Sequence, residues 1–312
     1  MERIVIPGSA TYSPVALSDV MLGAPVTARI LLGASAPGQA LQAVAAAAYL
    51  GSAARDRWAR RNVRPVDFQK AFGVDVDTLE PMPEGMRLTE MRELSQRLSD
   101  AFTAERIERK ETAVEVDRLL TRYIATITEQ EVVTSSEIRS FTLAKVAMPF
   151  ALGACDPISG DVAIFQDTGI LEPHVIAHEF CHRKGYLKEL HAQVLAFLCL
   201  RVSANPVFVQ SARAERLGRH LSTLADSDNL KYHALLDDLP LRPELEAAFR
   251  DRCPRTATRS GPFSQGMRAL YDRRMKLTGQ NGISDYDRGF TDFLWTFRNS
   301  TVATQPLDHA AL

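Results

Sequence analysis

Residues 174–200 read HVIAHEFCHRKGYLKELHAQVLAFLCL, and this stretch contains the pattern H-E-x-x-H, from His178 to His182. Apolar residues lead into the pattern and continue at helical spacing, which predicts an α-helix. A spacing of four places both imidazoles on one helix face, where each can offer a nitrogen to a single metal ion. Glu179 lies about 100° round the helix from His178, so its carboxylate can reach a metal-bound water without occupying a coordination position.

A metal site of this kind needs a third protein ligand. An unbroken helix cannot supply it from later sequence, because residues eleven positions on lie about 16 Å further along the axis. Gly185 supplies a turn three residues after His182, and a second helix is predicted to start near Leu187. The first turn of that helix returns toward the metal. Glu189 and His191 are both candidate third ligands, and the residues alone leave the choice open.

The sequence around this stretch predicts a mainly α (α+β) fold. An alanine-rich helix is predicted from residue 38 to about 61, and residues 91–127 repeat apolar side chains at helical intervals. Two β-prone runs, 139–146 and 161–166, flank the turn-forming residues 156–160, which predicts a small β-sheet beside the H-E-x-x-H helix.

Three regions are predicted along the chain. They are an N-terminal helical region over residues 1–130, a catalytic region over residues 131–300 and a tail over residues 301–312. We expect the first two regions to form one compact unit.

The composition limits the class of protein. With 312 residues, 46% hydrophobic and 24% charged, the chain can bury a full core, which excludes disordered, collagen-like and disulfide-scaffold proteins. The formal charge of -1 gives no general attraction for nucleic acid, so we expect no nucleic-acid partner. Four cysteines without C-x-x-C spacing are typical of a reduced compartment. We find no export signal and no membrane span, and therefore expect a cytoplasmic protein.

Separated blocks of the sequence match a family pattern in order. They are GACDPISG at 153–160, HEFCHRKG at 178–185, ELHAQ at 189–193, and a later run, 271–286, with Lys, Gly, Gln, Gly and Tyr at 276, 279, 280, 282 and 286. They resemble an uncharacterised, normally membrane-anchored bacterial family of H-E-x-x-H zinc peptidase-like proteins of the gluzincin or zincin type. The resemblance covers roughly residues 130–298 and implies a zincin-like helical fold. Because we find no counterpart of the family's N-terminal membrane helices, we expect a soluble member.

The resemblance also implies roles for individual residues. In gluzincins with an E-x-x-A-[DN] second motif, the first glutamate is the third zinc ligand, which makes Glu189 the ligand and Gln193 its supporting residue. Position 191 is a histidine where the family has glutamate, and His191 stays the alternative ligand. Tyr286, which the family run includes, is the candidate donor to a developing oxyanion. His174, one turn before the motif, is a further candidate for the site.

These residues predict a zinc-dependent, metallopeptidase-like hydrolase that cleaves an amide or peptide bond. His178, His182 and Glu189 would hold Zn²⁺, and Glu179 would take the proton of the metal-bound water. The run 161–166 is expected to be an edge strand for an extended substrate. One alternative is a zincin-like enzyme that acts on a small-molecule biosynthetic intermediate as a hydrolase, cyclase or lyase. A second alternative is a non-catalytic, metal-stabilised binding protein.

Overall fold

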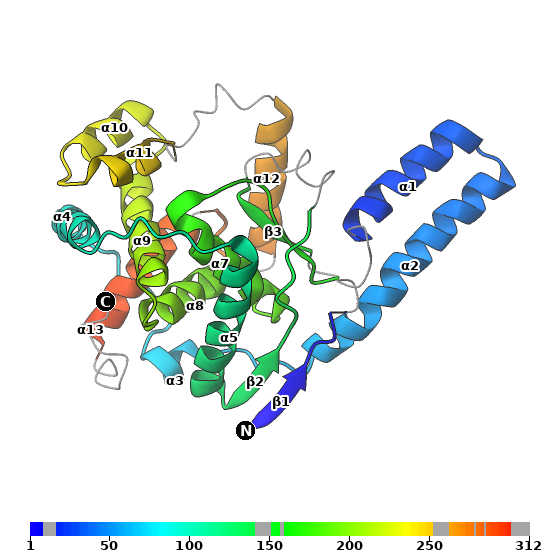
Figure 1. Cartoon of the computed structure of the whole chain (residues 1–312), viewed down its shortest axis with the longest axis horizontal. Helices are drawn as coiled ribbons and strands as arrows, with labels where there is room; N and C mark the ends of the chain where they lie inside the picture. The colour runs from blue at the N-terminus through cyan, green and yellow to red at the C-terminus, as the bar shows by residue number, and fades with distance from the viewer. Residues whose placement is uncertain are drawn as a thin grey trace. The chain divides into compact units, whose positions relative to one another are not determined.

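The computed structural model is mainly helical, as the sequence predicts, and its described part contains two small sheets (Figure 1). The predicted tail, the turn residues 157–158 and most of the β-prone run 139–146 lie outside the described residues. The structure describes residues 1–8, 17–140, 151–156, 159–251, 262–277, 279–283 and 285–300.

The chain divides into two compact units, and each takes residues from both predicted regions, 1–130 and 131–300. The first unit comprises Met1–Pro65, Arg109–Asp167 and Val175–Leu187. The second comprises Val66–Glu108, Thr168–His174 and Lys188–Leu312.

The described residues of the first unit form long helices and four short strands. Its helices are α1 (Leu17–Leu32), α2 (Ala36–Arg60) and α5 (Arg109–Thr128), together with most of α7 (Glu172–Arg183). Its strands are β1 (Glu2–Val5), β2 (Gln130–Val133), β3 (Gly153–Cys155) and β4 (Val162–Ile164). β1 pairs with β2 in parallel, and β3 pairs with β4 in antiparallel orientation.

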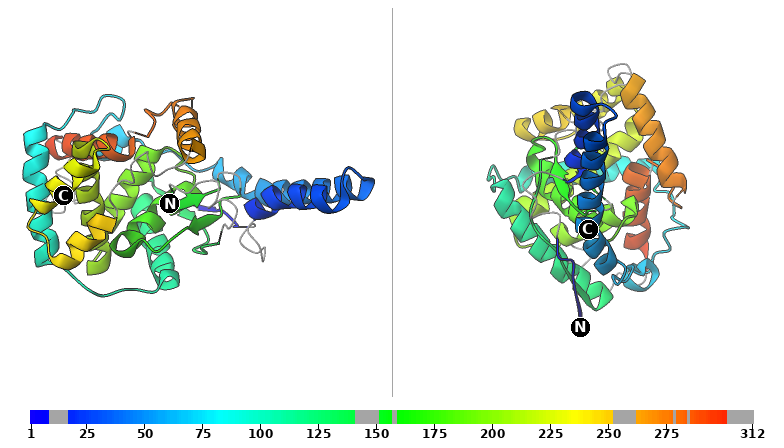
Figure 2. Two further views of the ribbon diagram at one scale, coloured as in Figure 1. Left: turned by 90° about the horizontal axis from the view of Figure 1, so that it is seen from above. Right: turned by 90° about the vertical axis from the view of Figure 1, so that its right-hand side faces the viewer.

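Helices α1 and α2 pack side by side as a hairpin, drawn in blue in Figures 1 and 2. Ser35 forms the N-cap of α2 because its hydroxyl accepts the amide proton of Gly38. The middle of α2 reaches the segment between β3 and β4, where the Tyr49 hydroxyl donates to the Asp156 carboxylate. Among the described residues, no helix has both the length and the apolar character needed to cross a membrane.

The run 161–166 contains strand β4, as predicted, and among the described residues this strand belongs to a two-stranded sheet. On one side of β4, Ala163 pairs with Ala154 of β3. On its other side, Ala163 forms a parallel bridge with Arg139, whose amide donates to the Val162 carbonyl. In the part of the chain that the structure describes, the outer edge of β4 is therefore partly covered by Arg139.

Helix α7 carries the H-E-x-x-H pattern and ends where the sequence predicts. The carbonyl of Phe180 accepts the amide proton of Lys184, and the carbonyl of Cys181 accepts that of Tyr186. Gly185 sits in this terminal turn at φ +107°, a conformation that side chains with a Cβ rarely adopt. The chain can therefore reverse within a few residues and begin the next helix.

Two buried cations fix the end of α7 in the first unit. The Arg183 guanidinium donates to the carbonyls of Ser135, Glu137 and Gly160. The Lys184 ammonium is fully buried and lies 2.8 Å from Asp117 Oδ1 on α5. It also donates to the hydroxyls of Thr121 and Thr134 and to the carbonyl of Val132. A buried ammonium needs this many partners, because without them its desolvation would be strongly unfavourable.

The second unit is built around α8 (Glu189–Arg201), whose residues are almost all buried. The run VLAFLCL over 194–200 is apolar on every side, as expected of a central helix. The other elements are α3 (Phe68–Phe72), α4 (Glu84–Asp100), η2 (Gly169–Leu171), α9 (Pro206–Ala225), α10 (Asn229–Asp237), α11 (Pro243–Asp251), α12 (Pro262–Leu277), η3 (Asp285–Gly289) and α13 (Phe290–Asn299).

A buried charge cluster joins α4 to α9 and should make the second unit sensitive to acid. Burial alone would raise the pKa of Glu90, but Arg216 and His220 lower it from 4.5 to about 2. Because the folded pKa is depressed, the stabilisation is present above pH 4.5 and is lost as the pH falls toward 2. We expect Glu90 to contribute about 3 kcal/mol to this loss, measurable by urea unfolding at a series of pH values.

The matched control for this prediction is Glu93, an exposed carboxylate on the same helix. Glu90→Gln should remove part of the acid dependence, whereas Glu93→Gln should leave it unchanged. Equal pH profiles for the two variants would show that the cluster does not govern acid stability.

Candidate metal centre

His178 and His182 project from one face of α7, as the spacing of four predicts. Their Nε2 atoms are 3.1 Å apart, and their ring centroids are 4.7 Å apart with the planes at 88°. The Nδ1 atom of His182 lies 2.8 Å from the carbonyl oxygen of Tyr186, in the turn after α7. With its proton on Nδ1, His182 donates to this carbonyl, and its Nε2 lone pair is then directed at the space that both rings face.

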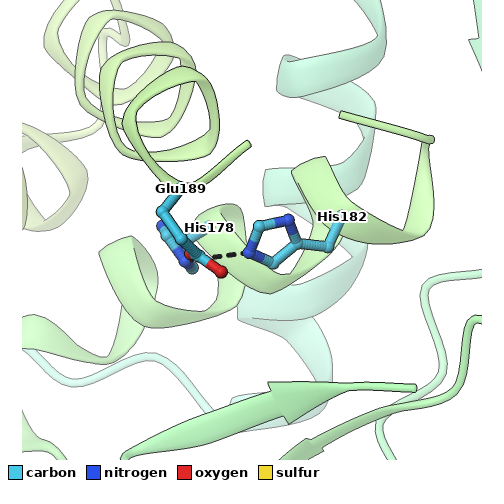
Figure 3. Close-up of side chains that lie close together, drawn as sticks. All are labelled: His178, His182 and Glu189. Carbon is cyan, nitrogen blue, oxygen red and sulfur yellow. Dashed lines mark hydrogen bonds between the residues drawn. The ribbon is translucent and has the colours of Figure 1, made fainter. Parts of the chain in front are cut away.

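Glu189, the first residue of α8, faces the two imidazoles (Figure 3). One ligand atom from each of His178, His182 and Glu189 lies within 4.8 Å of the others. Two bonds of about 2.0 Å at a tetrahedral angle place ligand atoms about 3.3 Å apart, so small side-chain movements would close all three round one ion. Two imidazole nitrogens and one carboxylate oxygen form a donor set that fits a metal ion.

His191 lies elsewhere, although the sequence left it open as a ligand. Its ring packs on Phe68 with centroids 4.2 Å apart, and it does not belong to the group of ligand atoms found among the described residues. Burial and the nearby Lys188 lower the pKa of His191 to about 4. Its ring is therefore neutral at pH 7 and forms part of the packing of the second unit.

Glu179 is buried on α7 beside strand β3. A Cβ atom added to Gly153 would come within 3.1 Å of Glu179 Cγ and 3.0 Å of the Ala163 carbonyl oxygen. Glycine at position 153 therefore allows the strand to approach the carboxylate closely. This closeness places the small sheet beside the H-E-x-x-H helix, as predicted.

Tyr271, which sequence reasoning did not single out, contacts Glu189 directly. Its hydroxyl donates to Glu189 Oε1 at 2.5 Å and lies 3.2 Å from the hydroxyl of Tyr286. Burial raises the pKa of Tyr286 well above its usual value, and the Glu189 carboxylate raises it further. The Tyr286 hydroxyl therefore keeps its proton at neutral pH. Tyr271 is the first residue of the 271–286 run that resembles the family pattern. This resemblance is the sequence signal from which Tyr271 could have been predicted.

Gln193 and His174 both contact the carboxylate of Glu215. The Gln193 amide donates to Glu215 Oε1 at 2.7 Å, and His174 Nδ1 lies 3.9 Å from Glu215 Oε2. The Arg219 guanidinium also binds Glu215, at 2.5 Å. Glu215 is therefore the centre of a second buried polar cluster, which His174 joins.

A comparison with protein-family models matches residues 83–294, about two thirds of the chain, to "Protein of unknown function (DUF3810)". The chain belongs to the DUF3810 family. The matched region of this DUF3810 protein includes the whole stretch from His178 to Glu189, and both Tyr271 and Tyr286. No curated protein and no solved structure matches the chain.

Proposed function

We propose that this DUF3810 protein is a zinc-dependent hydrolase of the zincin type, which cleaves an amide or peptide bond. The observation that carries the proposal is the convergence of His178, His182 and Glu189 within 4.8 Å, with Glu179 next to a ligand on the same helix. This combination supplies both a Lewis-acid site and a carboxylate base, which amide hydrolysis requires.

The donor set favours zinc over the hard cations. Zn²⁺ is commonly held by imidazole nitrogens together with a carboxylate, whereas Mg²⁺ and Ca²⁺ prefer sites made of oxygen ligands alone. When bound, the ion would polarise the substrate carbonyl and lower the pKa of a coordinated water to about 7.

In this proposal, Glu179 moves the proton. Its carboxylate accepts a proton from the attacking water and returns it to the nitrogen of the leaving amine, so the residue is unchanged after each turnover. The protonated Tyr286 hydroxyl donates to the oxygen on which negative charge develops. The edge strand β3, next to Glu179, offers backbone groups along which an extended substrate would pair.

The first test is the metal content of the protein. Protein purified without added metal is expected to carry about one equivalent of zinc per chain, because three protein ligands with an open fourth position suit one ion. Elemental analysis by mass spectrometry would measure it, with magnesium and calcium counted in the same sample. After chelation, dialysis against zinc should restore one equivalent. Protein that stays metal-free after this dialysis would contradict the proposed function.

A further inference from the structure

We infer that Tyr271 and Gln280 form a clamp that holds Glu189 in its metal-binding orientation, with Tyr271 as a positioning residue. The inference rests on the proposed function, since it assigns a purpose to groups around the proposed third ligand. All three residues belong to the second unit. Tyr271 lies on α12, and Gln280 lies in the turn that follows this helix.

The first half of the clamp acts on the carboxylate. The Tyr271 hydroxyl donates to Glu189 Oε1 at 2.5 Å, a short bond to a carboxylate oxygen. A glutamate side chain has three rotatable bonds, and ordering it for metal binding is entropically unfavourable. With Oε1 held by the phenol, the carboxylate is fixed in the orientation in which it lies near the two imidazoles. Tyr271 thus orders the ligand before a metal arrives.

The second half of the clamp acts on the backbone of the same residue. Helix α8 begins at Glu189, and its N-cap, Lys188, makes no side-chain capping hydrogen bond. The first amides of a helix lack partners within the helix. Gln280 supplies such a partner from outside the helix, because its Oε1 accepts the Glu189 amide proton at 2.8 Å. A side chain 91 residues away therefore fixes where α8 starts.

The turn that carries Gln280 is itself tied to α12. Gly279 and Gly282 have φ values of +76° and +88°, which favour glycine. The Asp272 carboxylate accepts the Ile283 amide proton at 2.9 Å, and a Cβ on Gly282 would clash with the same carboxylate at 2.2 Å. Tyr271 and Gln280 are therefore held in a fixed position relative to each other. One short segment thus holds both the side chain and the backbone of Glu189.

Tyr286 lies against the same clamp. Its hydroxyl lies 3.2 Å from that of Tyr271, and it also interacts with the Glu189 carboxylate.

The test compares the zinc affinity of two variants that each lose one hydroxyl. Tyr271→Phe should weaken zinc binding by about 10- to 100-fold, the range typical when a residue supporting a ligand is removed. The matched control is Tyr232→Phe, because the buried Tyr232 hydroxyl donates to the Phe249 carbonyl and not to the metal centre. Its zinc affinity should equal that of the wild type. Competition with a chelator would give the dissociation constants, without any need for a substrate.

Two further measurements separate positioning from a general structural role. In a Glu189→Ala background, Tyr271→Phe should cause no additional loss of affinity, because it acts through that carboxylate. The visible spectrum of bound Co²⁺ should change in Tyr271→Phe but not in Tyr232→Phe. Gln280→Ala, which keeps both tyrosines of the site, should weaken zinc binding by up to about tenfold.

The outcomes distinguish the clamp from the proposed function. Wild-type zinc affinity in both Tyr271→Phe and Gln280→Ala would overturn the clamp and leave the proposed hydrolase standing. Zinc binding with the predicted losses, but without hydrolysis of any amide, would support the clamp and overturn the hydrolase. A wild-type protein that binds neither zinc nor cobalt would overturn both.

Discussion

Replacing Glu179 with glutamine is expected to lower turnover by at least about a hundredfold while zinc content and folding stay unchanged, because a general base contributes 10²- to 10⁴-fold. Glutamine keeps the size of the side chain and its ability to form hydrogen bonds but cannot accept the proton of water. The close approach of Gly153 leaves little room beside this side chain, which is a reason to prefer this nearly isosteric change. The rate would be measured on amide substrates found by profiling peptide and small-amide libraries.

The matched control is Glu172→Gln, which makes the same chemical change in the first turn of the same helix. It should keep wild-type turnover. Near-normal turnover in Glu179→Gln would show that Glu179 is structural and that the water-activation mechanism is wrong, even with zinc in place. If the wild type binds zinc but hydrolyses no amide, the protein would instead fit a small-molecule enzyme or a metal-stabilised binding protein.

Replacing Glu189 with alanine is expected to weaken zinc binding by more than about a hundredfold, beyond the range found when only a supporting residue is lost. Replacing His191 with alanine should leave zinc affinity within a few-fold of the wild type. The reason is geometric, because Glu189 lies with the two imidazoles and His191 packs on Phe68. Competition with a chelator ranks the two variants on one scale.

The control for this pair is the stability of each metal-free variant, measured by urea unfolding. His191→Ala removes packing against Phe68 and should destabilise the fold, so its effect is on stability and not on zinc affinity. The opposite ranking of affinities would make the centre a three-histidine site and would remove the analogy with gluzincins.

The region from α7 to α8 could be predicted from the sequence because its signals are local. The apolar lead-in, the two histidines and Gly185 lie within a few residues of one another, and the turn needs only a residue that tolerates positive φ. The choice between Glu189 and His191 could not be made in this way. Residues two positions apart in sequence lie about 200° apart round a helix, so when Glu189 faces the imidazoles His191 must face away. Only the packing of α8 decides which of the two residues faces the imidazoles.

Other features depend on contacts that no local pattern contains. Tyr271 reaches Glu189 across 82 residues of sequence, and its helix gives no indication of what its hydroxyl will meet. The β-prone run 161–166 does contain a strand, but β-propensity reports only that a segment fits a sheet. How open the outer edge of that strand is depends on Arg139, which bridges to it from that side.

The buried ammonium of Lys184 links the metal centre to the order in which the chain folds. Lys184 stands two residues after His182, and its partners come from α5, β2 and the residue after β2. Until those elements are assembled, the end of α7 cannot dock without leaving a charge unpaired, and His182 cannot reach its place. The proposed zinc site therefore predicts that, during refolding, tight zinc capture follows the docking of α5 and does not precede it.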